Sequence, residues 1–347
     1  MKAMVVEHPG PIEKNPLRLV ELPVPEPGSD EVLIRVEVCA VCRTDLHVAE
    51  GDLPPHKSPV APGHEAVGTV VKLGAGAGRM LKEGDRVGVA WLHASCRTCP
   101  YCARGEENLC TAPRFTGYDV NGGYAEYLVA PEGFVYPLPA SVSVVEVAPL
   151  LCAGIIGYRA LRRSGVRRGE RLGLYGFGAS AHIVIQIARY WACEVYVATR
   201  GDKHRALARS MGAAWVGDAA DTPPEKLHAA IIFAPAGEIV PRALAALDRG
   251  GTLALAGVYM TPIPTLDYEA TLFYERNLRS VTANTRQDGK ELLDLATAIP
   301  LRTHTEEFPL EQANDALWKL KHDQINGAAV LRVSGQRDFL AKSAQRE

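Results

Sequence analysis

Four cysteines stand close together in the sequence, at Cys96, Cys99, Cys102 and Cys110. Tetrahedral Zn²⁺ prefers soft ligands in a compact arc, and thiolates spaced two residues apart can turn around a single ion. An iron–sulfur cluster is one alternative, because similar cysteine runs hold such clusters, and free or oxidised thiols in an irregular loop are another. The spacing favours a structural zinc site. With thiolates in all four positions the ion would have no place for water, so this site would shape a loop rather than do chemistry.

A second group of metal-binding residue types is scattered along the sequence. It consists of Cys42, His64 followed by Glu65, and Cys152. A catalytic zinc ion takes about three protein ligands from separate parts of a fold and keeps one position open. Each of these residues alone is a weak signal, because a lone cysteine in a β-rich segment is more often a small core residue than a ligand. The residues by themselves leave open whether these segments meet at one ion.

A glycine-rich turn follows an apolar stretch in the second half of the chain. Its residues are Gly176, Phe177, Gly178, Ala179, Ser180 and Ala181, in the pattern G-x-G-x-x-A. Between a predicted strand and a predicted helix this pattern indicates a dinucleotide site, because glycines let backbone amides approach the pyrophosphate at the positive helix end. A plain glycine turn between core elements is the alternative.

The end of the next predicted strand bears on the type of dinucleotide. A fold that prefers NAD places Asp or Glu there, about 20 residues past the glycines, to bind the ribose 2′-hydroxyl. This sequence has Thr199 and Arg200 at that place. The guanidinium of Arg200 could pair with a 2′-phosphate, so we expect NADP(H) to be favoured over NAD(H). Alternatively, Arg200 is a solvated surface residue and NAD binds without the acid.

The elements that must position these residues fall into two groups. Before about residue 150, short strands separated by Gly and Pro turns, such as 31–38 and 68–73, predict a β-rich, partly closed sheet. Beyond residue 170, alternating strands and helices predict a doubly wound parallel sheet, the α/β Rossmann type. The expected strands are 171–175, 194–198, 214–216, 229–233, 252–256 and 279–283, and the expected helices are 181–190, 202–211 and 238–248.

The last part of the sequence is expected to return to the β-rich domain. It resumes with residues 291–298 and contains a predicted strand near 305–308, a predicted helix at 310–321 and the apolar run 328–333. We therefore predict a discontinuous catalytic domain of residues 1–153 and 289–347. Residues 154–288 would form the dinucleotide-binding domain, and two domains suit a chain of 347 residues.

Composition excludes several classes of function. A formal net charge of −2 gives no basic field for nucleic acid, and no apolar run is long enough for a membrane span. The start resembles a strand rather than a secretory signal, so we expect a cytoplasmic protein. Because the cytosol keeps thiols reduced, the presence of 8 cysteines in this chain favours metal binding over disulfides.

Taken together, these segments resemble the zinc-dependent medium-chain alcohol dehydrogenase family over nearly the whole chain. Residues 87–110 are similar to the structural-zinc lobe of that family, and 148–154 to its junction into the cofactor domain. The resemblance implies a GroES-like fold for the β-rich catalytic domain, and two zinc ions per subunit. It also implies that the catalytic zinc ligands are Cys42, His64 and Cys152, with Glu65 behind the metal and Asp45 accepting from the free ring nitrogen of His64.

The resemblance further implies a reaction. Zinc would polarise the oxygen of an alcohol or aldehyde, and hydride would pass between the substrate carbon and the nicotinamide. Protons would leave through the Thr44 hydroxyl, the nicotinamide ribose and His47. Arg43 resembles a pyrophosphate-binding arginine. Trp91 matches a bulky residue that narrows the substrate pocket, which favours small primary alcohols and their aldehydes.

Two other functions remain alternatives. One is a polyol or sugar dehydrogenase on the same scaffold, which the constriction at Trp91 disfavours. The other is a non-enzymatic protein that binds zinc and dinucleotide, which would not need the pair Thr44 and His47. By analogy with the family we expect a homo-oligomer, a tetramer or a dimer.

Overall fold

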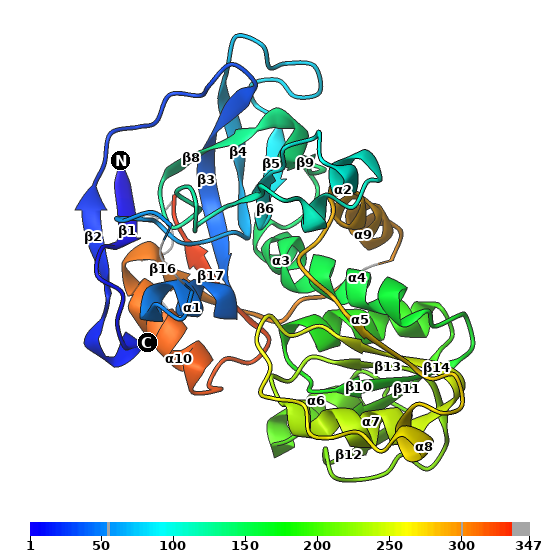
Figure 1. Cartoon of the computed structure of the whole chain (residues 1–347). Helices are drawn as coiled ribbons and strands as arrows, with labels where there is room; N and C mark the ends of the chain where they lie inside the picture. Colours follow the sequence, from blue (N-terminus) through cyan, green and yellow to red (C-terminus); the bar gives the residue numbers. More distant parts are fainter. Residues whose placement is uncertain (54–55, 300, 335–347) are drawn as a thin grey trace. The chain divides into compact units, whose positions relative to one another are not determined.

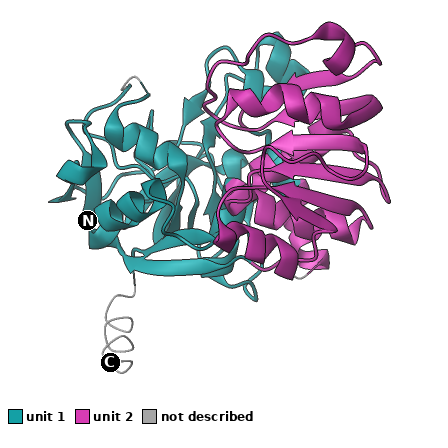
Figure 2. Ribbon diagram, turned by 90° about the horizontal axis from the view of Figure 1, so that it is seen from below, with its two compact units in different colours: residues 1–152, 284–290, 303–347 teal, residues 153–283, 291–302 magenta. Residues whose placement is uncertain are grey.

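The computed structural model describes residues 1–53, 56–299 and 301–334, and the chain divides into two compact units. Unit 1 comprises residues 1–152, 284–290 and 303–347, and unit 2 comprises 153–283 and 291–302 (Figure 2). The first junction lies one residue from the predicted one. The second differs more, because helix α9 (Arg286–Ala298) begins in unit 1 and continues in unit 2. Its unbroken helical pattern gives no sign of that crossing, and residues 335–347 of the predicted catalytic domain lie outside the described residues.

Unit 1 is built around a seven-stranded sheet with β3 at its centre (Figure 1). The strand order is β16-β17-β3-β4-β5-β9, and β8 pairs with the first part of β3. Apolar and β-branched residues along β3 are buried on both faces, and this is why the strand lies in the core. The strands are β3 (Glu31–Val41), β4 (Ala66–Leu73), β5 (Arg86–Val89), β8 (Tyr127–Pro131), β9 (Val135–Pro137), β16 (Thr305–Pro309) and β17 (Ala328–Arg332).

Strand β17, near the end of the described chain, belongs to the same sheet. Strand β17 pairs antiparallel with the last part of β3, with Ala329 opposite Val41 and Arg332 opposite Val38. The predicted return of the apolar run to the β-rich part is therefore observed. Two small ribbons complete the strands of unit 1, β1 (Lys2–Val6) with β2 (Leu17–Glu21) and β6 (Leu92–Ala94) with β7 (Arg114–Phe115).

Unit 2 contains a six-stranded parallel sheet in the order β12-β11-β10-β13-β14-β15. The chain starts in the middle of the sheet, builds one half, and returns to build the other, which is the predicted doubly wound topology. The strands are β10 (Arg171–Tyr175), β11 (Glu194–Ala198), β12 (Trp215–Gly217), β13 (Leu227–Ile232), β14 (Leu247–Leu255) and β15 (Asn277–Ser280).

Several element boundaries in unit 2 differ from the prediction by a few residues, and two of the differences concern helices. The helix expected to reach residue 248 ends at Ala246, because the buried Leu247 already pairs with Leu227 as the start of β14. The helix expected from Ala181 begins at Ala179, inside the glycine turn. The helices are α1 (Arg43–Glu50), α2 (Pro100–Ala103), α3 (Val144–Val147), α4 (Ala153–Ser164), α5 (Ala179–Tyr190), α6 (Asp202–Ser210), α7 (Val240–Ala246), α8 (Tyr268–Thr271), α9 and α10 (Ala313–Lys321).

Within the described ranges, no single helix is long and apolar enough to span a bilayer; only the consecutive segments Val144–Leu151 and Ala153–Ser164, taken together across a bend, reach such a length and apolarity.

Candidate functional site

Strand β3 leads directly into the first candidate metal ligand. Cys42 follows the strand in extended conformation and caps helix α1, so its sulfur lies at the start of the helix. The backbone N–H of Cys42 donates to Oδ2 of Asp45 at 2.9 Å, which closes the first turn. The position of this sulfur is thus fixed by a central strand on one side and a capped helix on the other.

The three scattered segments meet in unit 1. One ligand atom from each of Cys42, His64, Glu65 and Cys152 lies within 4.8 Å of the others. The two sulfur atoms are 3.9 Å apart. His64 and Glu65 come from the turn before β4, and Cys152 follows the short helical turn Ala148–Leu151. The structure therefore brings together the residues that the sequence analysis could only list separately.

The imidazole of His64 suits a metal ligand. Its Nδ1 lies 2.9 Å from Oδ1 of Asp45, and both side chains are 1% exposed. Its Nε2 is buried, and no group in the described part of the chain bonds to it. A buried nitrogen without a partner is costly, whereas a lone pair directed at a cation would be satisfied. Two sulfurs and this nitrogen are a donor set that fits zinc.

The electrostatics of the sulfurs agree with a cation site. A hydrogen bond from the Cys152 thiol lowers the pKa of Cys42 well below its ordinary value, although burial opposes this. The same bond, together with burial, raises the pKa of Cys152. The two pKa values move in opposite directions because two thiolates this close repel each other. A cation between them would allow both to ionise.

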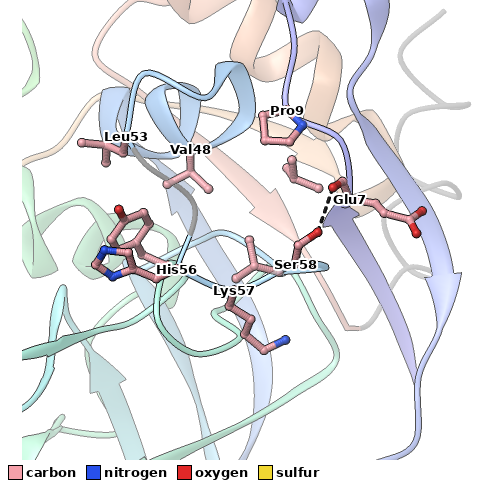
Figure 3. A pocket seen from close by; sticks show the side chains of 10 residues that line it. Glu7, Pro9, Val48, Leu53, His56, Lys57 and Ser58 are labelled. Carbon is pink, nitrogen blue, oxygen red and sulfur yellow. Dashed lines mark hydrogen bonds between the residues drawn. The ribbon is translucent and has the colours of Figure 1, made fainter.

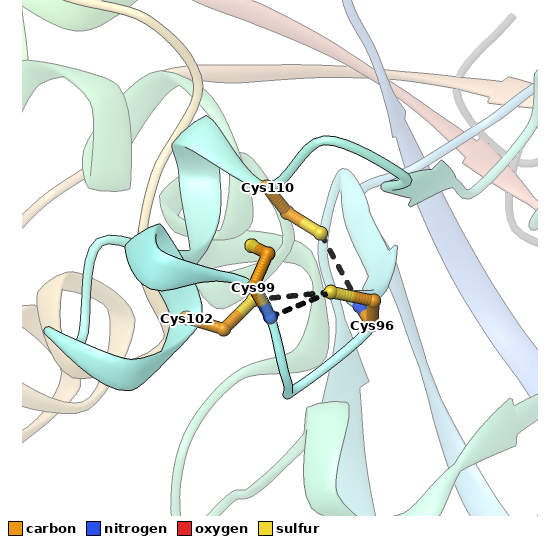
Figure 4. A group of neighbouring side chains, drawn as sticks. All are labelled: Cys96, Cys99, Cys102 and Cys110. Atoms are coloured by element: carbon orange, nitrogen blue, oxygen red, sulfur yellow. Dashed lines mark hydrogen bonds between the residues drawn. The ribbon is translucent and has the colours of Figure 1, made fainter.

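The four clustered cysteines form a second compact group in unit 1. Their sulfur atoms all lie within 4.8 Å of one another (Figure 4), and the thiols are free. Backbone amides point at the sulfurs, with Cys96 N donating to Cys110 at 3.2 Å and Cys99 N to Cys96 at 3.3 Å. Hydrogen bonds from the N–H groups of Cys102 and Thr111 lower the pKa of Cys99 to about 6. Such a cage of thiolate-stabilising donors fits a closed, four-coordinate zinc site.

Residues of the predicted proton path lie on helix α1. Thr44 is buried, and its Oγ1 is 3.8 Å from the sulfur of Cys42. His47 lies one turn further along, and its Nδ1 is 2.7 Å from Oδ2 of Asp52, a residue that the sequence analysis missed. The guanidinium of Arg43 pairs with the exposed Asp323 at 3.0 Å. An exposed pair of this kind is weak, so it leaves Arg43 able to exchange partners.

An aromatic group lies beside the candidate zinc ligands. The ring of Trp91 meets the His64 ring edge-on, with centroids 4.9 Å apart. Phe115 stacks on the indole at 4.8 Å and Tyr118 lies at 6.1 Å. The sequence indicates Trp91 but neither Phe115 nor Tyr118, because nothing in their spacing shows that β7 returns beside Trp91. By contrast, a cavity of about 100 Å³ around His56, Lys57 and Val48 has none of the predicted ligands in its lining (Figure 3).

The glycine turn of unit 2 has the backbone expected of an anion site. Gly176 adopts φ 88°, and a Cβ there would meet the backbone nitrogen of Ala234 at 3.1 Å. Because α5 begins at Ala179, the N–H groups of Ala179, Ser180 and Ala181 belong to its first turn, where helices leave donors free. Phe177 is buried and anchors the turn in the core.

Strand β11 ends directly before Thr199 and Arg200, as the sequence indicates. The N–H of Thr199 donates to the carbonyl oxygen of Gly217 at 3.0 Å, and Thr199 is buried. Arg200 is exposed, directly after the strand. No carboxylate occupies either position.

Comparisons with known proteins agree with this geometry. Two family models match the chain: "Alcohol dehydrogenase GroES-like domain" over residues 28–140 and "Zinc-binding dehydrogenase" over residues 181–298. A Mycobacterium tuberculosis protein named "Probable alcohol dehydrogenase AdhA" is 52% identical over 337 residues, covering 96% of this chain and 97% of that protein.

Solved structures show the same relationship. A cinnamyl alcohol dehydrogenase from Sorghum bicolor superposes with a TM-score of 0.87 at 27% identity, covering 96% of this chain and 98% of that one. The crystal structure of CAD from Helicobacter pylori complexed with NADP(H) gives 0.85 at 25% identity, with coverage of 96% and 98%. The predicted GroES-like and Rossmann fold class is therefore confirmed. The chain belongs to the zinc-dependent medium-chain dehydrogenase/reductase family, among its alcohol dehydrogenases.

Proposed function

We propose that this alcohol dehydrogenase holds two zinc ions, one for catalysis and one for structure. Cys42, His64 and Cys152 would bind the first, with Glu65 at its rear. The thiolates of Cys96, Cys99, Cys102 and Cys110 would bind the second. The observation that carries the proposal is the buried Nε2 of His64, which has no partner in the described chain and lies in a cluster with two sulfurs and a carboxylate.

The residues around this site have separate roles in the proposed reaction. A zinc ion bound there supplies a Lewis acid that polarises the substrate oxygen, and the nicotinamide dinucleotide takes or gives the hydride. Asp45 holds the ring of His64 in one orientation through the 2.9 Å bond to Nδ1. Thr44 orients the hydroxyl of the alcohol by hydrogen bonding. His47, partly exposed, exchanges the proton with water.

For the dinucleotide we propose the glycine turn as the pyrophosphate site. The first-turn amides of α5 would donate to the phosphates. Arg43 stays a proposed pyrophosphate-binding residue because of its charge and its match to the family. Arg200 pairs with a 2′-phosphate, so NADP(H) is favoured over NAD(H). The absence of a carboxylate at Thr199 and Arg200 supports this choice, because such a carboxylate would bind the ribose hydroxyl and repel a phosphate.

For the substrate we propose small primary alcohols and their aldehydes. Trp91, stacked on Phe115 and edge-on to His64, places bulk next to the ligand cluster. Longer polyols fit such a site less well. The pair Thr44 and His47 on one face of α1 favours an enzyme over a protein that only binds zinc and dinucleotide. We also propose a homo-oligomer, a dimer or a tetramer.

One experiment tests these proposals together. The purified protein is analysed for zinc, and absorbance at 340 nm is followed with ethanol or butanal and each dinucleotide, before and after a chelator. We expect two zinc ions per chain, turnover that the chelator abolishes, and a lower KM for NADP⁺ than for NAD⁺. Full metal content without turnover on any alcohol would support the binding protein instead.

A further inference from the structure

Helix α1 ends one turn after His47, and its end directs the chain back towards that side chain. Gly51 closes the helix with φ 85° and ψ 14°, and its N–H donates to the carbonyl oxygen of His47 at 3.0 Å. This left-handed conformation suits glycine, and a Cβ at Gly51 would also meet Cβ of Pro9 at 3.0 Å. The next residue, Asp52, thereby reaches the imidazole, with Oδ2 2.7 Å from Nδ1 of His47.

This contact decides which nitrogen of His47 carries the hydrogen. A carboxylate only accepts hydrogen bonds, so the neutral imidazole beside Asp52 donates from Nδ1 and keeps its lone pair on Nε2. In that tautomer the ring of His47 can take up a proton at Nε2 without a ring flip. The carboxylate then faces an imidazolium, which it stabilises by charge as well as by hydrogen bonding.

A second carboxylate has the same relation to a histidine at the other end of α1. Asp45 accepts from Nδ1 of His64, and both side chains are 1% exposed. His47 and Asp52 are 23% and 58% exposed. The buried pair is suited to holding a ligand, whereas the pair that water reaches is suited to exchanging protons. Helix α1 therefore contributes one member to each pair, Asp45 to the buried one and His47 to the one that water reaches.

We propose that Asp52 is a positioning residue for proton release, acting through His47; this inference rests on the proposed function. During alcohol oxidation the C–H hydrogen leaves as hydride to the dinucleotide, and the hydroxyl proton must leave separately. Nε2 of His47 accepts that proton while Nδ1 keeps its hydrogen in the bond to Asp52. Nε2 then releases the proton to water, and His47 returns to its starting tautomer. Aldehyde reduction uses the same steps in reverse.

The test is a double-mutant cycle in the zinc-loaded enzyme. Asp52→Asn, His47→Gln and the double variant are compared by the single-turnover rate of dinucleotide reduction at 340 nm, and by kcat and KM for the alcohol. Asp52→Asn should lower the rate and kcat roughly tenfold, as loss of a carboxylate behind a functional histidine does elsewhere, and leave KM within about twofold. Asp52→Glu should recover part of the rate. With Gln at position 47, Asp52→Asn should have no further effect, because its action passes through the imidazole.

Glu50→Gln is the matched control. Glu50 is a carboxylate at the same end of α1, but it accepts from Ile12 N at 2.9 Å and from Lys321 at 2.8 Å instead of from His47. Its variant should turn over at the wild-type rate. A wild-type kcat in Asp52→Asn, or an equal loss with and without His47, would overturn the inference alone. An active wild type whose His47→Gln variant is equally fast would overturn both the inference and the proposed proton path.

Discussion

Asp45 and His64 form a fully buried carboxylate–imidazole pair, with Oδ1 and Nδ1 2.9 Å apart. The same carboxylate also accepts from the backbone nitrogens of Cys42 at 2.9 Å and Gly63 at 3.1 Å, and from the hydroxyl of Tyr124 at 3.3 Å. One side chain thus holds both Cys42 and His64 in place. Because its acceptors are satisfied by four donors, the burial of this charge is compensated by hydrogen bonds.

We therefore expect Asp45→Asn to weaken the catalytic zinc site. The amide keeps the size of the side chain but cannot accept at both ends, so the orientation of His64 is no longer fixed. Zinc affinity at this site should fall by about 10- to 100-fold. Competition with a chromogenic chelator measures it, and an affinity equal to that of the wild type would show that Asp45 does not support the ligand.

Removing a proposed ligand should abolish turnover while the fold persists. Cys42→Ala should lower kcat at least roughly a hundredfold and remove one zinc ion per chain, since catalysis needs the metal in place. Cys193→Ala is the control, because Cys193 is a buried free cysteine of unit 2, where its sulfur donates to the carbonyl oxygen of Arg167. Retained activity in Cys42→Ala, with circular dichroism unchanged, would exclude the ligand set.

A substitution in the four-cysteine loop should lower the stability of the protein rather than its turnover. Cys99→Ser removes one thiolate from the cage in Figure 4. Because the binding energy of a structural zinc is folding energy, Tm should fall by about 5–10 °C, with one zinc ion lost. Differential scanning calorimetry with metal analysis measures both, and an unchanged Tm at reduced zinc content would argue against a structural role.

Glu132 should make the stability of unit 1 depend on pH. Its buried carboxylate accepts from the backbone nitrogens of Gly78, Met80 and Leu81 at 2.9–3.1 Å, and of Arg79 at 3.4 Å. Burial alone would raise the pKa of Glu132, but these hydrogen bonds outweigh it and lower the pKa below 4.5. The stabilisation is therefore complete above pH 4.5 and is lost as the pH falls through the lowered value.

Glu132→Gln replaces this acceptor with a neutral amide of the same size. It should reduce the free energy of unfolding by about 2 kcal/mol at pH 7, because hydrogen bonds to a charged acceptor are lost. The difference from the wild type should shrink as the pH falls below 4.5. Urea unfolding at several pH values tests this, and a difference that stays constant with pH would contradict the role of the charge.

Arg200→Ala tests the proposed preference for NADP(H) over NAD(H). Losing a guanidinium–phosphate pair worth about 2 kcal/mol should raise KM for NADP⁺ roughly thirtyfold and leave KM for NAD⁺ nearly unchanged. Arg209→Ala removes another exposed arginine, from α6, and serves as the control. If both dinucleotides were affected alike by Arg200→Ala, pairing with the 2′-phosphate would be refuted.

Sequence patterns predicted correctly those parts of the structure that depend on residues close together in the sequence. The spacing of Cys96 to Cys110 is enough to define a cage, because the loop that closes it is short. The strands of unit 2 follow from apolar runs between turns, and their parallel order follows from the helices between them. For Cys42, His64 and Cys152 the spacing gave no such information, and only the resemblance to a family placed them together.

Contacts made by exposed polar side chains could not be predicted. Gly51 indicates the end of a helix, but nothing in the sequence shows that Asp52 turns back to His47. Likewise, Arg43 has the residue type of a phosphate ligand, yet it lies against Asp323 at the far end of the chain. Such pairs depend on loop conformation and on long-range packing rather than on periodicity.

The pairing of β17 with β3 has a consequence for synthesis of the protein. The strand that leads into Cys42 is made early, but its neighbour β17 emerges from the ribosome only after almost all the other described residues. Until then the last part of β3, beyond its pairing with β8, has an open edge, and the cysteine beside it has no finished sheet to hold it. Unit 2, apart from its short last segment, can complete its sheet first. The sheet that holds Cys42 is therefore finished only with the C-terminal part of the chain, and a ribosome that stalls before then leaves this cysteine next to a partly paired strand.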